Sequence, residues 1–580
     1  MTGRFTETRG SNVQPPRERV ARLAGEQRSP CAVPTRSGER CSPAEHLANI
    51  ELDLNITRTG IRRFCIAACL IAWSGACAAR AEVRLSPVIS DGAVLQRGVK
   101  ACVWGSADAG EKVTVTFAGQ TKTTAADAFG RWRVALDPLS ASAKPRPLTA
   151  AGRGNTVTVK SVYVGEVWLY LSQSWHLDSR RSPVGPAELA KLPPICAHVP
   201  ASVWEHQNHS QRPQDGMDGR GGWRVFSPPG KYYRSDAFHF ARRLAEAVGV
   251  PVGVMALGAS TLESMTPPAG FAAVERQMGP AAAEIAAWVP TTARGRKAYL
   301  KTLDEIDAWA KRSRATVGRS RISYRDFTQP PSLPGPPAIG RGPTTTYNAL
   351  YHRYARATVR GIVVQPKTFN VGDPQYALKA KALVLGLRAV FGRQDLPVCW
   401  MQMHSPGRYE VRDAQDPAQW VRMRSAQNAL AGLPHVSVVA TYDLKATNRN
   451  EPDVCHRAAR WAAAPAGNGP VRSGPAYKSH RIEGSAVAVE FARAGQGLMV
   501  GTWRTGKGVL PATLMPMGFE LAGVDGTWHA ATGVVRGRTV VVTCDKVARP
   551  KAVRYAWAPQ PAQANLYNRA GFPALPFSAP

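Results

Sequence analysis

Short stretches in which apolar and polar residues alternate follow one another through residues 82–160. They read AVLQRG, ACVWGSA, KVTVTFAG, GRWRVAL and NTVTVKSV, and Asp-Gly, Ala-Gly and Phe-Gly pairs separate them. Alternation is typical of strands that bury one face, and glycine-containing pairs form the tight turns between such strands. The pattern predicts a small β-sandwich over residues 82–160.

The pattern changes to strands interleaved with amphipathic helices over residues 161–465. For example, AFHFARRLAEAVG places Phe238, Ala241, Leu244 and Val248 on one helical face, and the apolar run VPVGVMAL follows at once. Such alternation predicts an α/β domain with a mainly parallel sheet and helices on both sides.

Two further changes of pattern set the outline of the chain. Residues 270–340 look like an insertion, because a charged helical stretch is followed there by the Pro- and Gly-rich linker QPPSLPGPPAIGRGP. From residue 471 to 580 short strand patterns return, as in AVAVEF and TVVVTC. The sequence therefore predicts an α/β domain flanked by two β-sandwich-like modules.

The run Val162–Leu171 reads as a buried strand and ends in the polar turn Ser172-Gln173-Ser174-Trp175. Ligands of α/β folds bind at the carboxyl ends of central strands, so Ser174 is a candidate nucleophile. A single serine after a strand is more often a turn residue. The spacing alone leaves both interpretations open.

The first 81 residues differ from the rest. Residues 1–57 are rich in Pro, Arg, Ser and Glu without periodicity, which predicts disorder. Residues 58–81 join basic residues to the apolar run FCIAACLIAWSGACAA, the order of a secretory signal peptide, and this run is too short for a stable membrane span of roughly 20 residues. We expect a secreted or periplasmic protein. Alternatively, translation starts downstream and residues 1–57 are never made.

The formal net charge of +33 is unusually high. The basic residues are mostly arginines scattered through Ala- and Gly-rich sequence, so we expect a solvated basic surface and no nucleic-acid partner. The cysteines after residue 81 are widely spaced and include no CxxC pair, and the chain contains no HExxH, EF-hand or phosphate-loop motif. We therefore expect no metal and no cofactor.

Longer motifs are spread over the whole of residues 82–580. They include SDGAVLQRG at 90–98, VGEVWL at 164–169, FGRQDLPVCWMQM at 391–403, GFELAGVDGTWHAA at 518–531 and VRYAWAPQPAQANLYNRAGFPALPF at 553–577. These motifs resemble those of the sialate O-acetylesterase family of SGNH-type hydrolases. The resemblance implies a three-layer α/β domain and an esterase in which a serine attacks an acetyl ester on a sugar or glycan and releases acetate.

The resemblance also implies roles for single residues. The family motif Gly-Gln-Ser-Asn corresponds to Ser172-Gln173-Ser174-Trp175, which makes Ser174 the nucleophile and places Gln173 beside it. The glycine and the asparagine of the motif are replaced. The large ring of Trp175 stands where the family has a small polar group.

Two further family blocks line the site. A Gly-Gly-Thr turn, whose backbone N–H groups face the oxyanion, corresponds to Gly258-Ala259-Ser260. A Tyr-Gln-Gly-Glu-Ser-Asn block corresponds to residues 365–370, where Asn370 matches and Gln365 matches after a shift of one residue. Pro366 removes a backbone donor from this loop.

The family's general base lies in an Asp-x-His-Pro motif, and here the histidine position is Glu451. A carboxylate with an ordinary pKa is a weak base for a serine hydroxyl. His456 lies five residues further on and is a weak candidate for a substitute base. His176 and His404 are other candidates, although each is more often a surface or core histidine.

Three interpretations follow. The first is a secreted carbohydrate O-acetylesterase with impaired or altered catalysis. The second is an inactive relative that binds carbohydrate or acts as a scaffold. The third is a different hydrolase in which Glu451 has taken a new role. We place the esterase first because Ser174 remains and the motifs cover the chain.

Overall fold

The computed structural model describes residues 82–580, with gaps at 173–184, 200–209, 211, 215–221, 227–235, 259, 318–329, 336–341, 367–369, 404–417, 445–450, 465–472 and 505–506. The expected disordered segment and signal peptide therefore lie outside the described residues. In the part of the chain that the structure describes, no helix is long and apolar enough to span a membrane. The five cysteines in this part are all free thiols.

The N-terminal module is made of strands that alternate buried and exposed side chains, as in RWRVAL of β6. The strands are β1 (Arg84–Leu85), β2 (Ala93–Gln96), β3 (Ala101–Ser106), β4 (Lys112–Phe117), β5 (Gln120–Ala125), β6 (Arg131–Leu136) and β7 (Ser142–Ala151). Strands β1, β3 and β6 form one small antiparallel sheet. The other strands of the module belong to a second, larger sheet.

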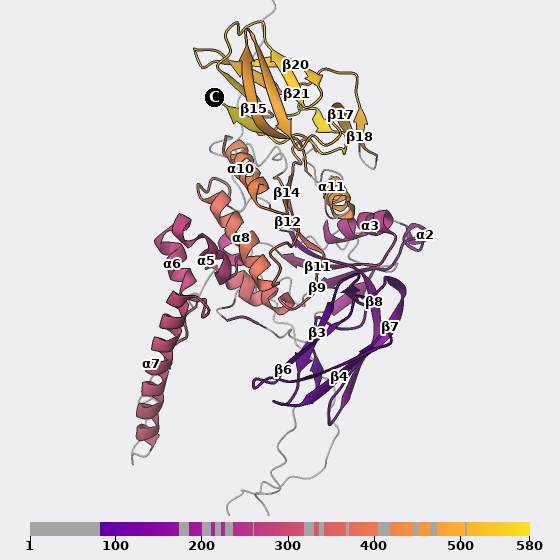
Figure 1. Ribbon diagram of the computed structural model, residues 1–580, viewed down its shortest axis with the longest axis vertical. Helices are drawn as coiled ribbons and strands as arrows, with labels where there is room; N and C mark the ends of the chain where they lie inside the picture. The colour runs from indigo at the N-terminus through magenta and orange to yellow at the C-terminus, as the bar shows by residue number, and fades with distance from the viewer. Residues whose placement is uncertain are drawn as a thin grey trace, which may run out of the picture. The chain divides into compact units, whose positions relative to one another are not determined.

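Strand β8 (Thr156–Ser172) joins the N-terminal module to the α/β domain. Its first half pairs antiparallel with β7, and β2 runs parallel to its middle. Its second half runs parallel to β11 (Val252–Gly258) on one side and β12 (Gly361–Gln365) on the other (Figure 1). The predicted boundary at residues 160 and 161 falls inside this strand, so β8 belongs to both modules.

The parallel strands of the α/β domain follow the order β9-β11-β8-β12-β13-β14, with β10 antiparallel at the edge. The remaining strands are β9 (Ile195–Val199), β10 (Gly222–Val225), β13 (Val398–Met401) and β14 (Val436–Val439). Together with β2, β4, β5 and β7 of the N-terminal module they make one eleven-stranded sheet. The sheet is mixed as a whole, whereas the strands that belong to the α/β domain are parallel apart from β10.

Helices cover both faces of the parallel strands because alternate residues of β8 are buried on opposite sides. Trp168 and Tyr170 pack with α3 (Asp236–Val248) and α11 (Glu451–Ala463). Leu169 and Leu171 belong to the core on the other face, which includes residues of α4 (Leu262–Met265), α8 (Tyr376–Val390) and α10 (Ala418–Asn428).

The range expected to be an insertion contains most of α5 (Pro268–Met278), and all of α6 (Pro280–Ala286) and α7 (Ala293–Val317). Among the described residues of α7, only Gly295 and Thr316 are buried. A further short helix, α2 (Pro186–Leu189), precedes β9.

The C-terminal module consists of a seven-stranded antiparallel sheet and a three-stranded sheet, which fits the predicted sandwich-like module. Its strands are β15 (Ala476–Glu483), β16 (Ala486–Ala492), β17 (Leu498–Arg504), β18 (Gly508–Pro511), β19 (Phe519–Ala522), β20 (Trp528–Arg536), β21 (Thr539–Thr543), β22 (Ala552–Tyr555), β23 (Leu566–Asn568) and β24 (Phe577–Ala579). The motif at 553–577 bonds to the α/β domain through its backbone, since Arg424 donates to the carbonyls of Ala558 and Pro559.

Candidate active site

The carboxyl ends of three neighbouring strands form the candidate site. Ser172 at the end of β8 is in register with Gly258 at the end of β11 and with Gln365 at the end of β12. Ser174 and Gln173, the predicted nucleophile and its neighbour, follow directly after Ser172 but lie outside the described residues. The structure therefore fixes the strand end from which the predicted nucleophile follows.

A buried carboxylate holds the end of β8. The Ser172 hydroxyl donates to Asp236 Oδ2 at 2.9 Å, and both residues are buried. Asp236 is the first residue of α3, where the positive end of the helix dipole favours a negative charge. Sequence reasoning missed Asp236. Its place at the start of an amphipathic helix was the available signal.

A second polar pair involves Tyr170, which lies two residues before Ser172 on the same face of β8. The Tyr170 hydroxyl donates to Gln365 Oε1 and lies 3.5 Å from Cys455 Sγ. Burial raises the pKa of Tyr170 well above its usual value, and the neighbouring Cys455 and Asp236 add to this effect. Tyr170 is therefore a neutral donor, and the Gln365 side chain is turned toward it.

On the face of the sheet that α4 and α8 cover, the turns after β11 and β12 meet. The Tyr351 hydroxyl donates to the carbonyl of Gly258 at 2.7 Å. The Leu262 N–H at the start of α4 donates to Asn370 Oδ1 at 2.9 Å. Asn370 has a φ of +66°, a left-handed conformation that Asn tolerates better than most residues. The structure thus brings Asn370 to the turn that follows Gly258.

Charged groups surround the Asn370 amide. Its Nδ2 donates to Glu263 Oε2 at 2.9 Å, and Lys379 on α8 donates to Glu263 and to Asp373 Oδ2. Burial alone would lower the pKa of Lys379, but its bonds to Asp373 and Glu263 outweigh burial and raise it. Lys379 therefore stays charged. Sequence reasoning assigned no role to Glu263, Lys379 or Asp373.

The described contacts of the His456 side chain lie with the C-terminal module and with the later turns of α3. Its ring packs edge-on against Trp503 of the C-terminal module, with centroids 5.8 Å apart. Its charged neighbours on α3 are Arg243 and Glu246, about 10–15 Å along the helix from Asp236. Burial, helped by Arg243 and Arg460, lowers the pKa of His456 to about 4.

The other candidate bases are less fully defined. Glu451 is the first residue of α11, but its side chain lies outside the described residues, as do His176 and His404. His239, which the sequence analysis did not consider, is buried in α3 one helical turn from Asp236. In the part of the chain that the structure describes, no group of three or more His, Cys, Asp or Glu residues is arranged to hold a metal ion.

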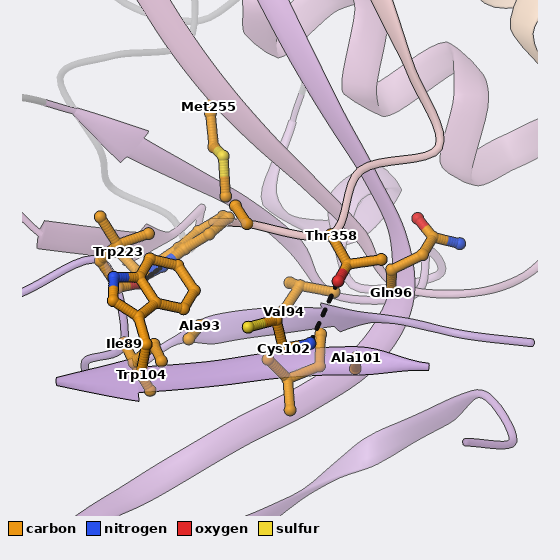
Figure 2. Close-up of a pocket in the computed structure, with 13 residues that line it drawn as sticks. Ile89, Ala93, Val94, Gln96, Ala101, Cys102, Trp104, Trp223, Met255 and Thr358 are labelled. Atoms are coloured by element: carbon orange, nitrogen blue, oxygen red, sulfur yellow. Dashed lines mark hydrogen bonds between the residues drawn. The ribbon is translucent and has the colours of Figure 1, made fainter. Parts of the chain in front are cut away.

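A small cavity lies elsewhere in the molecule, between β2, β3 and β11 (Figure 2). Its volume of about 20 Å³ is enough for roughly one water molecule. Cys102 N–H donates to Thr358 Oγ1 beside it, and Trp223 and Met255 form part of its wall. The residues that line this cavity do not include those at the strand ends, Ser172, Gly258 and Gln365.

Comparisons with known proteins support an esterase. No protein-family model matches the chain, and no curated protein gives a significant match. A solved structure does match: a carbohydrate acetylesterase from Xanthomonas citri, with a TM-score of 0.62 and 26% sequence identity. The match covers 86% of this chain and 99% of the other. Over most of its length, then, this chain is similar to a carbohydrate esterase.

Proposed function

We propose that the protein is a carbohydrate O-acetylesterase of the SGNH type, similar to the sialate O-acetylesterases and acting in a secreted or periplasmic compartment. The structural likeness to a carbohydrate acetylesterase, which covers nearly all of that chain, carries the proposal. The row of Ser172, Gly258 and Gln365 supports it, because open α/β sheets bind ligands at the carboxyl ends of their strands.

In the proposed reaction the Ser174 hydroxyl attacks the acetyl carbonyl and loses its proton to a base. Gly258, Asn370 and Gln173 line the place where the oxyanion develops, and backbone N–H donors stabilise it. Collapse of the tetrahedral intermediate releases the sugar hydroxyl, which takes the proton. Water then hydrolyses the acetyl-serine, giving acetate and the free enzyme.

The base is the weakest part of this site. Glu451, the first residue of α11, occupies the family's histidine position, and a carboxylate with an ordinary pKa is a weak base for a serine hydroxyl. We therefore propose that turnover is slow. Some acceleration persists even when a triad member is missing, because the oxyanion donors and substrate binding still contribute.

Acetate release tests the proposal. Full-length protein is incubated with a generic acetyl ester and with O-acetylated sialic acid, beside Ser174→Ala and the control Ser479→Ala. Ser479 lies on the largely exposed strand β15 of the C-terminal module, where its hydroxyl donates to Glu490. We expect turnover in the wild type and the control, and at least about a thousandfold loss in Ser174→Ala. Equal turnover in all three proteins would exclude Ser174 as the nucleophile.

An inactive carbohydrate-binding protein is the second candidate. The observation that supports it is the packing of the His456 ring against Trp503 of the C-terminal module, because His456 is the described candidate for a substitute base. If the wild type releases no acetate but retains O-acetylated glycans on a column, this second function replaces the first.

A further inference from the structure

Four side chains link the two turns that flank the end of β8. In the sheet β8 lies between β11 and β12, so the turn after β11 and the turn after β12 stand on its two sides. Glu263 lies in α4, directly after the first of these turns, and Asn370 and Asp373 belong to the second. Lys379, on the first turn of α8, joins them. We call these four residues the Asn370 bridge.

Both ends of the Asn370 amide are used in this bridge. Its Oδ1 accepts from the Leu262 N–H, and its Nδ2 donates to Glu263 at 2.9 Å and more weakly to Asp373 at 3.4 Å. Asp373 is itself held, because its N–H donates to the carbonyl of Asn370 and its Oδ1 accepts from the Gln375 N–H. The contacts fix the rotamer of Asn370 and tie its turn to α4.

Lys379 offsets part of the negative charge of the two carboxylates of the bridge. It bonds to both Glu263 and Asp373, and the exposed fractions of the three side chains are only 16%, 24% and 15%. Without the lysine, two partly buried carboxylates would share the Asn370 amide and repel one another. The turn that carries Asn370 would then move away from α4 or take up water.

We infer that Lys379 is a positioning residue for the proposed esterase site, and that it acts by holding the turns after β11 and β12 together around the end of β8. The inference rests on the proposed function for its catalytic consequence. A site whose donors are already in place needs no reorganisation during the reaction, and small displacements are expensive in rate. Lys379 itself does not contact the reacting atoms.

Two variants of the full-length protein test this role. Lys379→Met removes the charge and keeps much of the side-chain volume, whereas Lys379→Arg restores a cation. Lys381→Met is the matched control, because Lys381 lies on the same helix and donates to Gln277 at an exposed position. Hydrogen exchange over residues 260–266 and 370–376, and kcat and KM for acetate release, are measured for each protein.

For Lys379→Met we expect exchange in these two segments to be at least about tenfold faster, since local opening no longer has to break the bridge. We also expect kcat to fall by about 10- to 100-fold while KM changes by less than about twofold. Lys379→Arg should restore most of the slow exchange and most of kcat, and Lys381→Met should match the wild type in both measurements.

The outcomes separate this role from others. A raised KM with unchanged kcat would mean that Lys379 contacts the substrate, and would overturn the positioning role. Unchanged exchange in Lys379→Met would show that the lysine does not hold the turns. If the wild type releases no acetate, the esterase function fails together with the catalytic consequence, and exchange still decides whether Lys379 joins the two turns.

Discussion

The ionisable groups on the two faces of the sheet differ in burial near the carboxyl ends of its strands. On the α3 and α11 face these groups are buried: Asp236 holds Ser172, Tyr170 is neutral, and Arg457 forms an ion pair with Asp443. On the α4 and α8 face the groups of the Asn370 bridge are partly exposed. The first face resembles a protein core, and the second resembles a surface network.

The difference teaches which changes affect folding and which affect the site. A buried polar group has no water to replace a lost partner, so removing the partner costs stability. A partly exposed group recovers much of its hydration, so the same loss costs little stability and mainly changes local geometry. The following predictions test this contrast, from the largest expected effect to the smallest.

Arg457→Met should have the largest effect. The Arg457 guanidinium forms two bonds to Asp443, at 2.7 and 2.8 Å, and lies over the Trp503 ring. Without it the buried Asp443 carboxylate loses both of these bonds and is left with the bond from the Tyr567 hydroxyl. We expect a loss of about 3–5 kcal/mol in the free energy of unfolding, measured in urea.

The exposed pair Lys478–Glu490 provides the control for this measurement. Lys478→Met should cost less than about 1 kcal/mol. Equal losses in the two variants would contradict the contrast between buried and exposed charge pairs.

Tyr170→Phe should have an intermediate effect. The change keeps the ring that packs against Phe240 but removes the hydroxyl that donates to buried Gln365. We expect a loss of about 1–3 kcal/mol, because an acceptor is left unsatisfied in the core. Tyr163→Phe, at a partly buried position on the same strand, is the control. An unchanged unfolding midpoint for Tyr170→Phe would show that water replaces the lost donor.

The same contrast decides which parts of this arrangement the sequence could predict. The apolar face of α3 and the buried strand before Ser174 were predictable, because Phe238, Ala241, Leu244 and the residues of β8 follow local periodicity. The Asn370 bridge was not, because Asn370 and Leu262 are 108 residues apart and only the strand order brings them together. Pairing of distant polar groups leaves no periodic signal.

The same reasoning explains why the sequence could not predict the contacts of the motif at 553–577 or the identity of the base. The long C-terminal motif is a docking segment whose carbonyls accept from Arg424, a contact that a sequence pattern cannot indicate. The resemblance predicts a histidine at the position of Glu451, but local spacing cannot tell whether His456 takes the role of a base. The packing of His456 on Trp503 depends on the C-terminal module.

The pH dependence of stability should reflect His456. Its pKa is lowered by burial to about 4, below the usual value of 6.5, so the unfolded chain binds the proton more tightly. The contribution of His456 is therefore fully present above pH 6.5 and is lost as the pH falls from about 6.5 to 4. Because the ring is partly exposed, we expect about 1–2 kcal/mol over this range, after allowing for solvent screening.

Urea unfolding at several pH values measures this contribution, and His456→Asn should make the dependence between pH 4 and 6.5 shallower. The substitution should not abolish the pH dependence of stability, because burial also lowers the pKa of His198 to about 4. A His456→Asn variant with the slope of the wild type would mean that the ring is hydrated in the folded protein.

The smallest effect on stability is expected for Lys379→Met, although its effect on the site should be large. The lysine bonds to two carboxylates that remain partly solvated, so their repulsion is screened and the loss in unfolding free energy should stay below about 1 kcal/mol. Asp236→Asn gives the opposite case, because it weakens a buried bond to Ser172. If Lys379→Met lowered the midpoint as much as Arg457→Met, the bridge would have to be counted as part of the core. A small loss of stability together with a large loss of kcat would instead show that the bridge orders the end of β8 without supporting the fold.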